Sequence, residues 1–309
     1  TPDGSNPFIT SRDSGRNLTV NQDVGTRLSI PWVWSDAERI SFSGGLDGKH
    51  YRLDSFNTNN FTFVYQFHDP NLGDQTIVSE SHSPQPVRHD TINYLPVSLA
   101  TDFSETDKRG STTANLSASC NGFGEQRVSY SDFPPGANPT NYPGSRSGMT
   151  YGKLNGSVIR DQKVFQDWSL LMRADGQTAT RPLISNEQFA LGGLNSVRGY
   201  FEGDEYGDAG WSGSIELRSP FVLTRVPGWA GDWPVWVRGA AFVDGGQRFL
   251  FQAPTGIPAT RALLGTGFGL SVNINNHVDM RITVGWPIRD SANTHAGDPH
   301  AYFSLGGQF

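Results

Sequence analysis

Residues able to act as nucleophiles, general bases or metal ligands are thinly spread along this chain. Its seven histidines lie mostly in turn-like segments, and none is paired with a Ser or Cys nucleophile in a recognisable arrangement. Cys120 is the single cysteine, so no intramolecular disulfide framework is possible, and no Cys or His cluster has zinc-site spacing. We therefore expect no catalytic residue, no metal site, no cofactor and no enzymatic activity.

Two stretches imitate ligand-binding loops. Residues 265–269 alternate glycine with Thr266 and Phe268 as a phosphate-binding loop does, but no helix pattern follows, so a strand with small inward residues is favoured. The acids Asp204, Glu205 and Asp208 could ligate calcium, but they fit no calcium-loop template. We expect these three acids to lie in a solvated turn.

Further charged residues lie within segments that otherwise alternate apolar and polar side chains. The simplest interpretation for most of them is the wet lining of a pore. Asp244 differs, because it ends an apolar run and is followed by two glycines that would let another backbone approach closely. These charged residues are Arg173, Glu216, Arg218, Arg238, Asp244, Asp279 and Arg281.

One cation is isolated in a stretch that cannot be a strand. Residues 192–211 are rich in glycine and acids, and they contain a single arginine, Arg198, between Val197 and the pair Gly199 and Tyr200. Such a sequence makes a tight turn that presents one cation at its tip. The stretch is therefore predicted to be a loop.

The segments that must position these residues are antiparallel strands. Apolar and polar residues alternate with period two in segment after segment, most clearly from Leu154 to Trp286, with turn signals and no helical pattern between them. Residues 133–148, rich in Pro, Gly, Asn and Ser, are expected to form a long exposed loop. The fold class is all-β.

Composition narrows the class of protein. The chain has 309 residues and a net charge of −6, and none of its apolar runs approaches the roughly 18 residues that a membrane helix needs. A helical membrane protein is excluded, whereas a membrane barrel is not, because its strands alternate lipid-facing and lumen-facing residues. Mild acidity argues against a nucleic-acid partner.

A soluble sandwich would show the same alternation, and three details favour a transmembrane barrel. The strands run about 9 to 11 residues, the length a tilted membrane strand needs. Tryptophans and Tyr302 stand at strand ends, as in interfacial girdles. The chain finishes as an alternating strand on Phe309, so we interpret Tyr302 and Phe309 as a terminal-strand insertion signal.

The segments 185–200, 207–211 and 215–220 closely resemble the outer-membrane transporters of the two-partner secretion system. These form the haemolysin-activator and filamentous-haemagglutinin transporter family, within the superfamily that includes the barrel-assembly insertase. The resemblance is strong from about Met149 to Phe309 and rests on general strand pattern before that.

The resemblance implies a sixteen-stranded barrel, preceded by periplasmic domains, with a long loop folded into the lumen. The tip of that loop would be the motif Val197, Arg198, Gly199 and Tyr200, and its arginine would pair with Asp244. Asp244 lies in a Phe-x-Asp-x-Gly motif of the barrel wall that consists here of Phe242, Asp244 and Gly246, and Glu216 is a second possible partner for Arg198.

The expected organisation is a leader or extramembrane segment over residues 1–15 and a transmembrane antiparallel barrel over residues 16–309. We count about 12 to 14 strands, so the barrel is expected to have about 12 to 16, with a lumenal loop at about 185–211. We expect no periplasmic domain in this chain.

The resemblance further implies a protein-conducting barrel of the bacterial outer membrane. Its partners would be an unfolded secreted protein that becomes β-helical, the lipid bilayer, and the barrel-assembly machinery during biogenesis. The alternatives are an insertase-like or scaffold barrel in a larger assembly, and a passive porin.

Overall fold

The computed structural model of the chain describes residues 8–69, 73–228, 231–253, 255–275 and 277–307. Within this part the chain is almost entirely β-structure, with two single-turn 3₁₀ helices, η1 (Pro139–Asn141) and η2 (Ser185–Glu187). None of the helices in the described part is long and apolar enough to cross a membrane. The predicted all-β class is confirmed.

The first half of the chain forms four long strands and two shorter ones, β3 and β6. They are β1 (Phe8–Trp34), β2 (Glu38–Asp69), β3 (Gly73–Pro84), β4 (Val87–Asp107), β5 (Gly110–Ser131) and β6 (Ser145–Gly148). The strand β1 already includes residues 8–15, which the sequence placed in a leader segment. The stretch expected to be one long loop, residues 133–148, contains η1 and the short strand β6, which pairs with β5.

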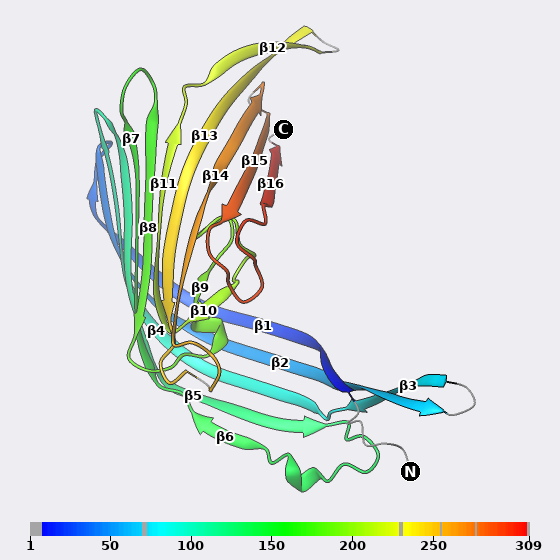
Figure 1. Cartoon of the computed structure of the whole chain (residues 1–309). Coiled ribbons are helices and arrows are strands. Elements are labelled where there is room, and N and C mark those ends of the chain that lie inside the picture. The colour runs from blue at the N-terminus through cyan, green and yellow to red at the C-terminus, as the bar shows by residue number, and fades with distance from the viewer. Residues whose placement is uncertain (1–7, 70–72, 229–230, 254, 276, 308–309) are drawn as a thin grey trace. The chain divides into compact units, whose positions relative to one another are not determined.

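The second half forms shorter strands joined by hairpins. They are β7 (Tyr151–Lys163), β8 (Ser169–Ala179), β9 (Phe189–Leu191), β10 (Glu205–Gly207), β11 (Ala209–Arg218), β12 (Val222–Gly228), β13 (Gly231–Phe249), β14 (Thr260–Ile274), β15 (Val278–Pro287) and β16 (His300–Gly307). Figure 1 shows β7, β8, β11, β13, β14, β15 and β16 side by side, with the small pair β9 and β10 beside them.

The described strands form one 14-stranded sheet and the separate pair β9–β10. The order of the large sheet runs from β1 to β16, with neighbours paired mostly as successive antiparallel hairpins. This number of strands lies within the predicted range of about 12 to 16, and β1 and β16 are the two ends of the order.

The chain divides into two compact units. The first comprises residues 1–26, 46–96 and 121–150, and the second comprises residues 27–45, 97–120 and 151–309. In the first unit, the buried apolar side chains include Tyr51, Ile92 and Tyr94. The second unit contains the predicted site residues.

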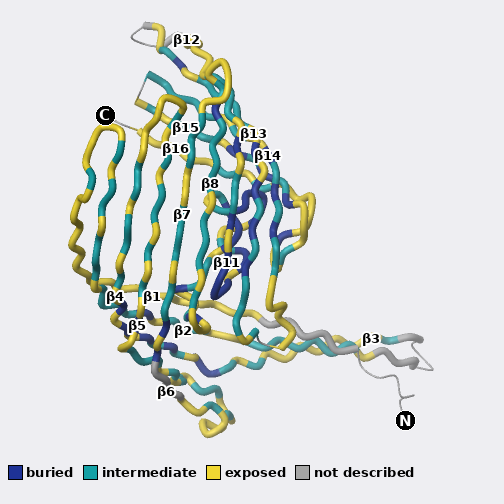
Figure 2. Tube along the Cα trace, turned by 90° about the vertical axis from the view of Figure 1, so that its left-hand side faces the viewer, coloured by how far each residue is buried: buried dark blue, intermediate teal, exposed yellow. Residues whose placement is uncertain are grey.

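The sheet of the second unit has two unlike faces. The loop that joins β8 to β11 packs on one of them, which we call the loop face, and the other is called the opposite face. Register assigns the residues: Asp244 of β13 lies beside Ser214 of β11 and Gly265 of β14, so these three share the loop face. Figure 2 shows buried residues, in dark blue, gathered around β11, while β7 is mostly intermediate or exposed.

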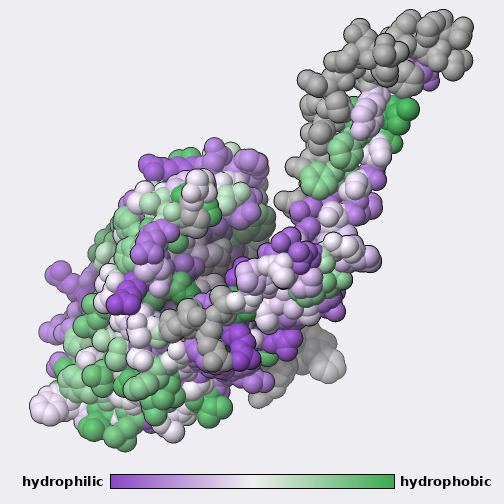
Figure 3. Space-filling model, turned by 90° about the horizontal axis from the view of Figure 1, so that it is seen from below, coloured by the Kyte–Doolittle hydropathy of each residue, from purple (hydrophilic) through white to green (hydrophobic). Residues whose placement is uncertain are grey.

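The opposite face of the second unit is apolar and exposed. One row across β14, β15 and β16 consists of Leu270, Ile282 and Phe303, which are neighbours in register and are 43%, 39% and 61% exposed. Seen from below, the surface of the molecule has green hydrophobic areas beside purple hydrophilic ones (Figure 3). A soluble sheet buries such a face, whereas a membrane strand presents it to lipid.

Candidate functional site

The loop between β8 and β11 folds as it does because glycines take positions closed to other residues. Gly192, Gly193 and Gly199 have φ angles of 109°, 102° and 101°, in the region that side chains disfavour. The backbone N–H of Gly193 donates to the carbonyl of Val197 at 3.0 Å, and the N–H of Gly192 donates to Oγ of Ser196 at 2.8 Å. These bonds close a tight turn that presents Arg198.

Arg198 is bound through every nitrogen of its guanidinium group. Its Nε donates to Oδ2 of Asp244 at 2.6 Å and its Nη2 to Oδ1 of the same carboxylate at 2.8 Å, which is a bidentate pair. Its Nη1 donates to Glu216, and its Nη2 also donates to Oγ of Ser214 at 2.9 Å. The backbone N–H of Arg198 donates to Asp244 as well, at 3.0 Å.

This ion-pair cluster is closed to water. Arg198 is 3% exposed, Asp244 0% and Glu216 2%. The ring of Phe242 lies under the guanidinium, with 3.4 Å between Cζ of Arg198 and the ring centroid. A buried pair of this geometry is much harder to open than a surface pair, because removing one partner leaves an uncompensated charge in a dry site.

Glu216 joins the loop tip to the cationic side chains of the loop face. Besides Arg198, its carboxylate accepts from Nε of Arg218 at 2.7 Å and from Nη2 of Arg281 at 3.2 Å. Burial alone would lower the pKa of Arg198, but hydrogen bonds and charge attraction from Asp244 and Glu216 outweigh it and raise that pKa. The arginine therefore stays charged.

Glycines on the wall make room for the loop tip. A Cβ at Gly265 of β14 would lie 2.0 Å from the carbonyl oxygen of Arg198, and one at Gly285 of β15 would lie 2.6 Å from the backbone nitrogen of Gly199. A Cβ at Gly246 would meet Leu191 of the loop at 2.6 Å. The stretch 265–269 is thus part of a strand with small inward residues, as predicted, and not a phosphate-binding loop.

Val197 and Tyr200 are the apolar part of the tip. Both are fully buried, in a cluster with Leu191 of β9 and Leu263 of β14, and Phe189 packs against it. The hydroxyl of Tyr200 lies 2.9 Å from the carbonyl oxygens of both Leu264 and Arg289. The tip is therefore held by packing as well as by charge.

The base of the loop has a second, separate anchor. Glu205 accepts from Nε of Arg248 at 3.0 Å, in a pair whose side chains are 5% and 3% exposed, and it also pairs with Arg261 at 3.1 Å. Asp204 accepts from Asn293 at 2.9 Å and Thr294 at 2.8 Å, and also from Ser291.

Asp208, the third acid of this stretch, accepts from the backbone N–H groups of Leu183 and Phe251, both at 2.7 Å. The prediction of a solvated turn for Asp204, Glu205 and Asp208 is wrong, because all three are buried and satisfied by partners distant in sequence. The described residues hold no group of three His, Cys, Asp or Glu residues that could bind a metal ion.

The structure also corrects one statement about the histidines. In the first unit, Nδ1 of His89 lies 2.6 Å from Oδ1 of Asp54, and its Nε2 lies 2.6 Å from Oγ of Ser131. The order of groups is that of a Ser-His-Asp triad, but Ser131 Oγ also lies 3.2 Å from the carboxylate of Asp132. A carboxylate at that distance opposes the negative charge of an acyl-transfer intermediate, so we interpret the three as a polar hydrogen-bond chain.

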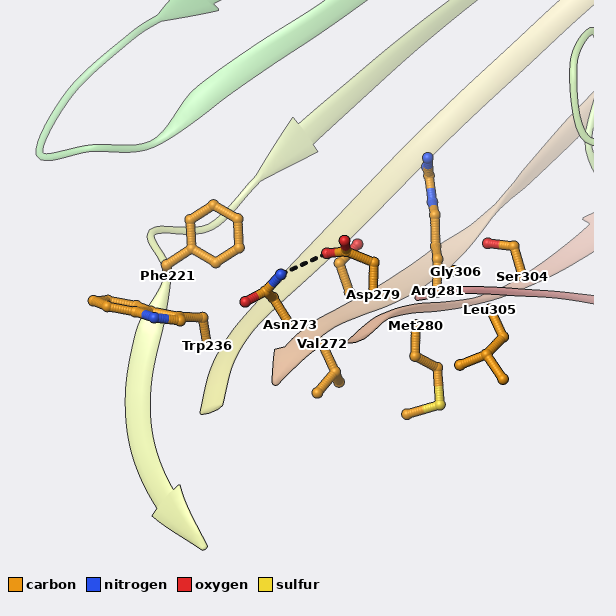
Figure 4. Close-up of a pocket in the computed structure, with 11 residues that line it drawn as sticks. Phe221, Trp236, Val272, Asn273, Asp279, Met280, Arg281, Ser304, Leu305 and Gly306 are labelled. Carbon is orange, nitrogen blue, oxygen red and sulfur yellow. Dashed lines mark hydrogen bonds between the residues drawn. The ribbon is translucent and has the colours of Figure 1, made fainter. Parts of the chain in front are cut away.

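Farther along the loop face, beyond the tip, lies an open cavity of about 780 Å³. The rings of Phe221 and Trp236 border it on one side (Figure 4). Asn273 donates to Asp279 at 2.7 Å across its floor, and Arg281 rises beside them. Asp279 and Arg281 therefore line this cavity. Arg238 lies on the same face but donates to the backbone of Ser219 and to the hydroxyl of Ser169.

The structure brings the predicted site residues together with one exception. The other predicted residues all belong to the docked loop or contact it: Val197, Arg198, Gly199, Tyr200, Phe242, Asp244, Gly246, Glu216 and Tyr302. Phe309 lies outside the described residues. Sequence reasoning missed Ser214, Gly285 and the anchor formed by Arg248. For Ser214 and Gly285, the alternation within each strand predicted the face of the sheet on which they lie. It did not predict the register between strands, which places them at the tip.

A sheet with a polar loop face that holds a buried ion pair, and with an exposed apolar opposite face, is typical of the class of transmembrane β-barrels. Residues 97–272 match the family model of the haemolysin secretion/activation protein ShlB/FhaC/HecB. The chain belongs to this family, and its membership confirms the expected fold class and the outer-membrane location. No curated protein sequence matches the chain.

Among solved structures the chain is similar to CdiB from Escherichia coli, with 17% identity and a TM-score of 0.49 over 95% of this chain and 62% of that one. It is similar to CdiB from Acinetobacter baumannii, with 14% identity and a TM-score of 0.39 over 97% and 65% of the two chains. A third is BamA from Haemophilus ducreyi lacking POTRA domains 1–3, with 13% identity and a TM-score of 0.38 over 96% and 71%. The chain thus spans less than two thirds of each CdiB chain.

Proposed function

We propose that this chain is the membrane-spanning part of an outer-membrane transporter that exports a partner protein to the cell surface by two-partner secretion. The observation that carries the proposal is the buried pairing of Arg198 with Asp244 and Glu216, which fixes a long loop on the polar face of a family barrel. A passive pore needs no loop anchored by a dry ion pair.

The cargo would pass as an unfolded chain along the polar loop face and would fold outside into a β-helix. Folding on the far side supplies the direction of transport, so the transporter needs neither nucleotide nor metal and carries out no catalytic step. Its other partners would be the lipid bilayer and, during biogenesis, the barrel-assembly machinery.

The test is secretion of a co-expressed partner by cells that carry Arg198→Glu. We expect export to fall at least tenfold, as an order of magnitude for a lost buried pair, while the barrel remains inserted and heat-modifiable. Adding Asp244→Arg should restore export only in part, because Glu216 would still face the new carboxylate at position 198. The control is Arg225→Glu, at an exposed position of β12.

Unchanged secretion in the Arg198→Glu single variant would overturn the proposal for the loop. Single-channel recording separates the alternatives: a steady large conductance in the wild type indicates a porin, and small flickering openings indicate a pore occupied by a loop. An insertase or scaffold role would be indicated if cells that lack the protein, and that express no secreted partner, assembled other outer-membrane barrels defectively.

A further inference from the structure

The terminal strand β16 lies at one end of the sheet order, and its pairing with β15 joins eight residue pairs from Val278↔Gly307 to Gly285↔His300. Alternation places His300, Tyr302, Ser304 and Gly306 on the loop face. Among the described strands, β15 is the one that pairs with β16.

The hydroxyl of Tyr302 is both a hydrogen-bond donor and a hydrogen-bond acceptor to the backbone of the loop tip. Its hydroxyl donates to the carbonyl oxygen of Tyr200 at 2.6 Å and accepts from the N–H of Gly199 at 3.0 Å. The phenol thus uses its donor and an acceptor lone pair on two adjacent residues of the motif that follows Arg198. This fixes the position of the phenol relative to the tip.

A second contact lies one residue farther along the loop and two residues earlier along β16. The ring of Phe201 meets the imidazole of His300 edge-on, with 4.5 Å between centroids and 82° between planes. Farther along β16 the next two loop-face residues, Ser304 and Gly306, instead line the open cavity of Figure 4. The contacts of β16 with the loop are therefore concentrated at the tip.

The tip joins strands that are not neighbours. Arg198 is docked on Asp244 of β13, while the next residues bind Tyr302 of β16, and β14 and β15 separate these two strands in the sheet. Gly199 allows this crossing because a Cβ there would lie 2.8 Å from the backbone of Trp286 and Pro287.

We propose that Tyr302 is a positioning residue that fastens the terminal strand to the docked loop tip, so that release of Arg198 from Asp244 also loosens β16. This role goes beyond the terminal insertion signal expected for Tyr302, because its side chain faces the loop and not lipid. It concerns the coupling of two elements and does not depend on which cargo is carried.

The test is hydrogen–deuterium exchange on the purified full chain in lipid vesicles, without cargo. Tyr302→Phe keeps the ring and removes the hydroxyl, and we expect residues 300–307 to exchange about tenfold faster, as for the loss of one to two hydrogen bonds. Exchange in β7 and β8 should stay as in the wild type. The control is Tyr206→Phe, which removes a phenol of the same loop that is half exposed.

The discriminating variant is Asp244→Asn on β13, which β14 and β15 separate from β16. Coupling through the tip predicts faster exchange in residues 300–307 in this variant too, although the substitution leaves Tyr302 intact. Wild-type exchange of β16 in either variant would overturn the proposal, and so would a uniform acceleration over all strands. Because no export is measured, a failed secretion assay would leave this result unaffected.

Discussion

At the scale of single residues, the site depends on the shape of a guanidinium group. Arg198 uses Nε and Nη2 to hold both oxygens of Asp244 while Nη1 reaches Glu216 on the next strand. A lysine ammonium is a point charge without this planar fork, so it cannot serve two carboxylates and Ser214 in the same geometry. The flat face of the group also packs on Phe242.

Arg198→Lys is therefore expected to weaken docking of the tip although it keeps the charge. We expect a loss of about 2 kcal/mol for the missing charge-assisted hydrogen bonds, which corresponds to about 30-fold more of the open form. Trypsin cleaves after either residue, so cleavage after position 198 in the purified, detergent-solubilised protein reports this population directly.

The matched control for this experiment is Arg225→Lys, at an exposed arginine of β12. It should leave the rate of cleavage after Arg198 unchanged. Equal rates in the wild type and in Arg198→Lys would show that the fork geometry does not hold the tip.

At the scale of elements, the loop has two anchors that are chemically independent. The tip is held by Arg198 on β13 and β11, and the base is held by Glu205 on Arg248 and Arg261 of β13 and β14. The base also binds the segment between β15 and β16 through Asp204 and Thr294. Glu205 belongs to β10, which pairs with β9, and the tip lies between these two short strands in the chain.

Glu205→Gln should release the base while the tip stays docked. The substitution leaves Arg248 buried without its counter-charge, a loss of about 3 kcal/mol for a dry pair. A spin label on Ala190→Cys of β9, in a Cys120→Ser background, should then show a larger mobile fraction.

Asp298→Asn, at an exposed turn, is the control for the spin-label experiment, and its spectrum should match that of the labelled parent. An unchanged spectrum in Glu205→Gln would mean that the tip alone determines the order of the hairpin.

The strands of the second half, and the face on which each of their residues lies, are predictable from the local pattern of the sequence. The alternation from Leu154 onward correctly predicted strands and their faces, because face depends only on period two within a strand. The prediction that Arg198 pairs with Asp244 rested on the family resemblance, because no pattern within either segment indicates which strand the loop contacts.

The acids at the loop base show why the remainder was not predictable. Glu205 finds Arg248 across 43 residues of chain, and Asp204 finds Thr294 across 90. Composition around these acids resembles that of a solvated turn, and only the folded arrangement supplies their partners. The contact of Asp54 with His89, across 35 residues, escaped sequence reasoning for the same reason.

At the scale of the whole molecule, the usual distribution of polarity is inverted. Charged side chains such as Asp244 and Glu216 are almost fully buried, while large apolar side chains such as Phe268 and Leu305 are 59% and 64% exposed. In water this arrangement would be unfavourable, because each exposed apolar side chain would lose the free energy of its burial. In a bilayer, lipid covers the apolar face and the same arrangement becomes stable.

An added charge should therefore lower the free energy of unfolding on the opposite face and be tolerated on the loop face. Ile282→Lys, on the opposite face of β15, should lower the free energy of unfolding in lipid vesicles by about 2 to 4 kcal/mol, the cost of a lysine near the bilayer midplane. Asn273→Lys is the control on the loop face of β14, where Asp279 lies opposite in register and offers a counter-charge. Urea titration of both variants measures the difference. Equal destabilisation by the two substitutions would mean that Ile282 does not face lipid, and the assignment of the two faces would then be wrong.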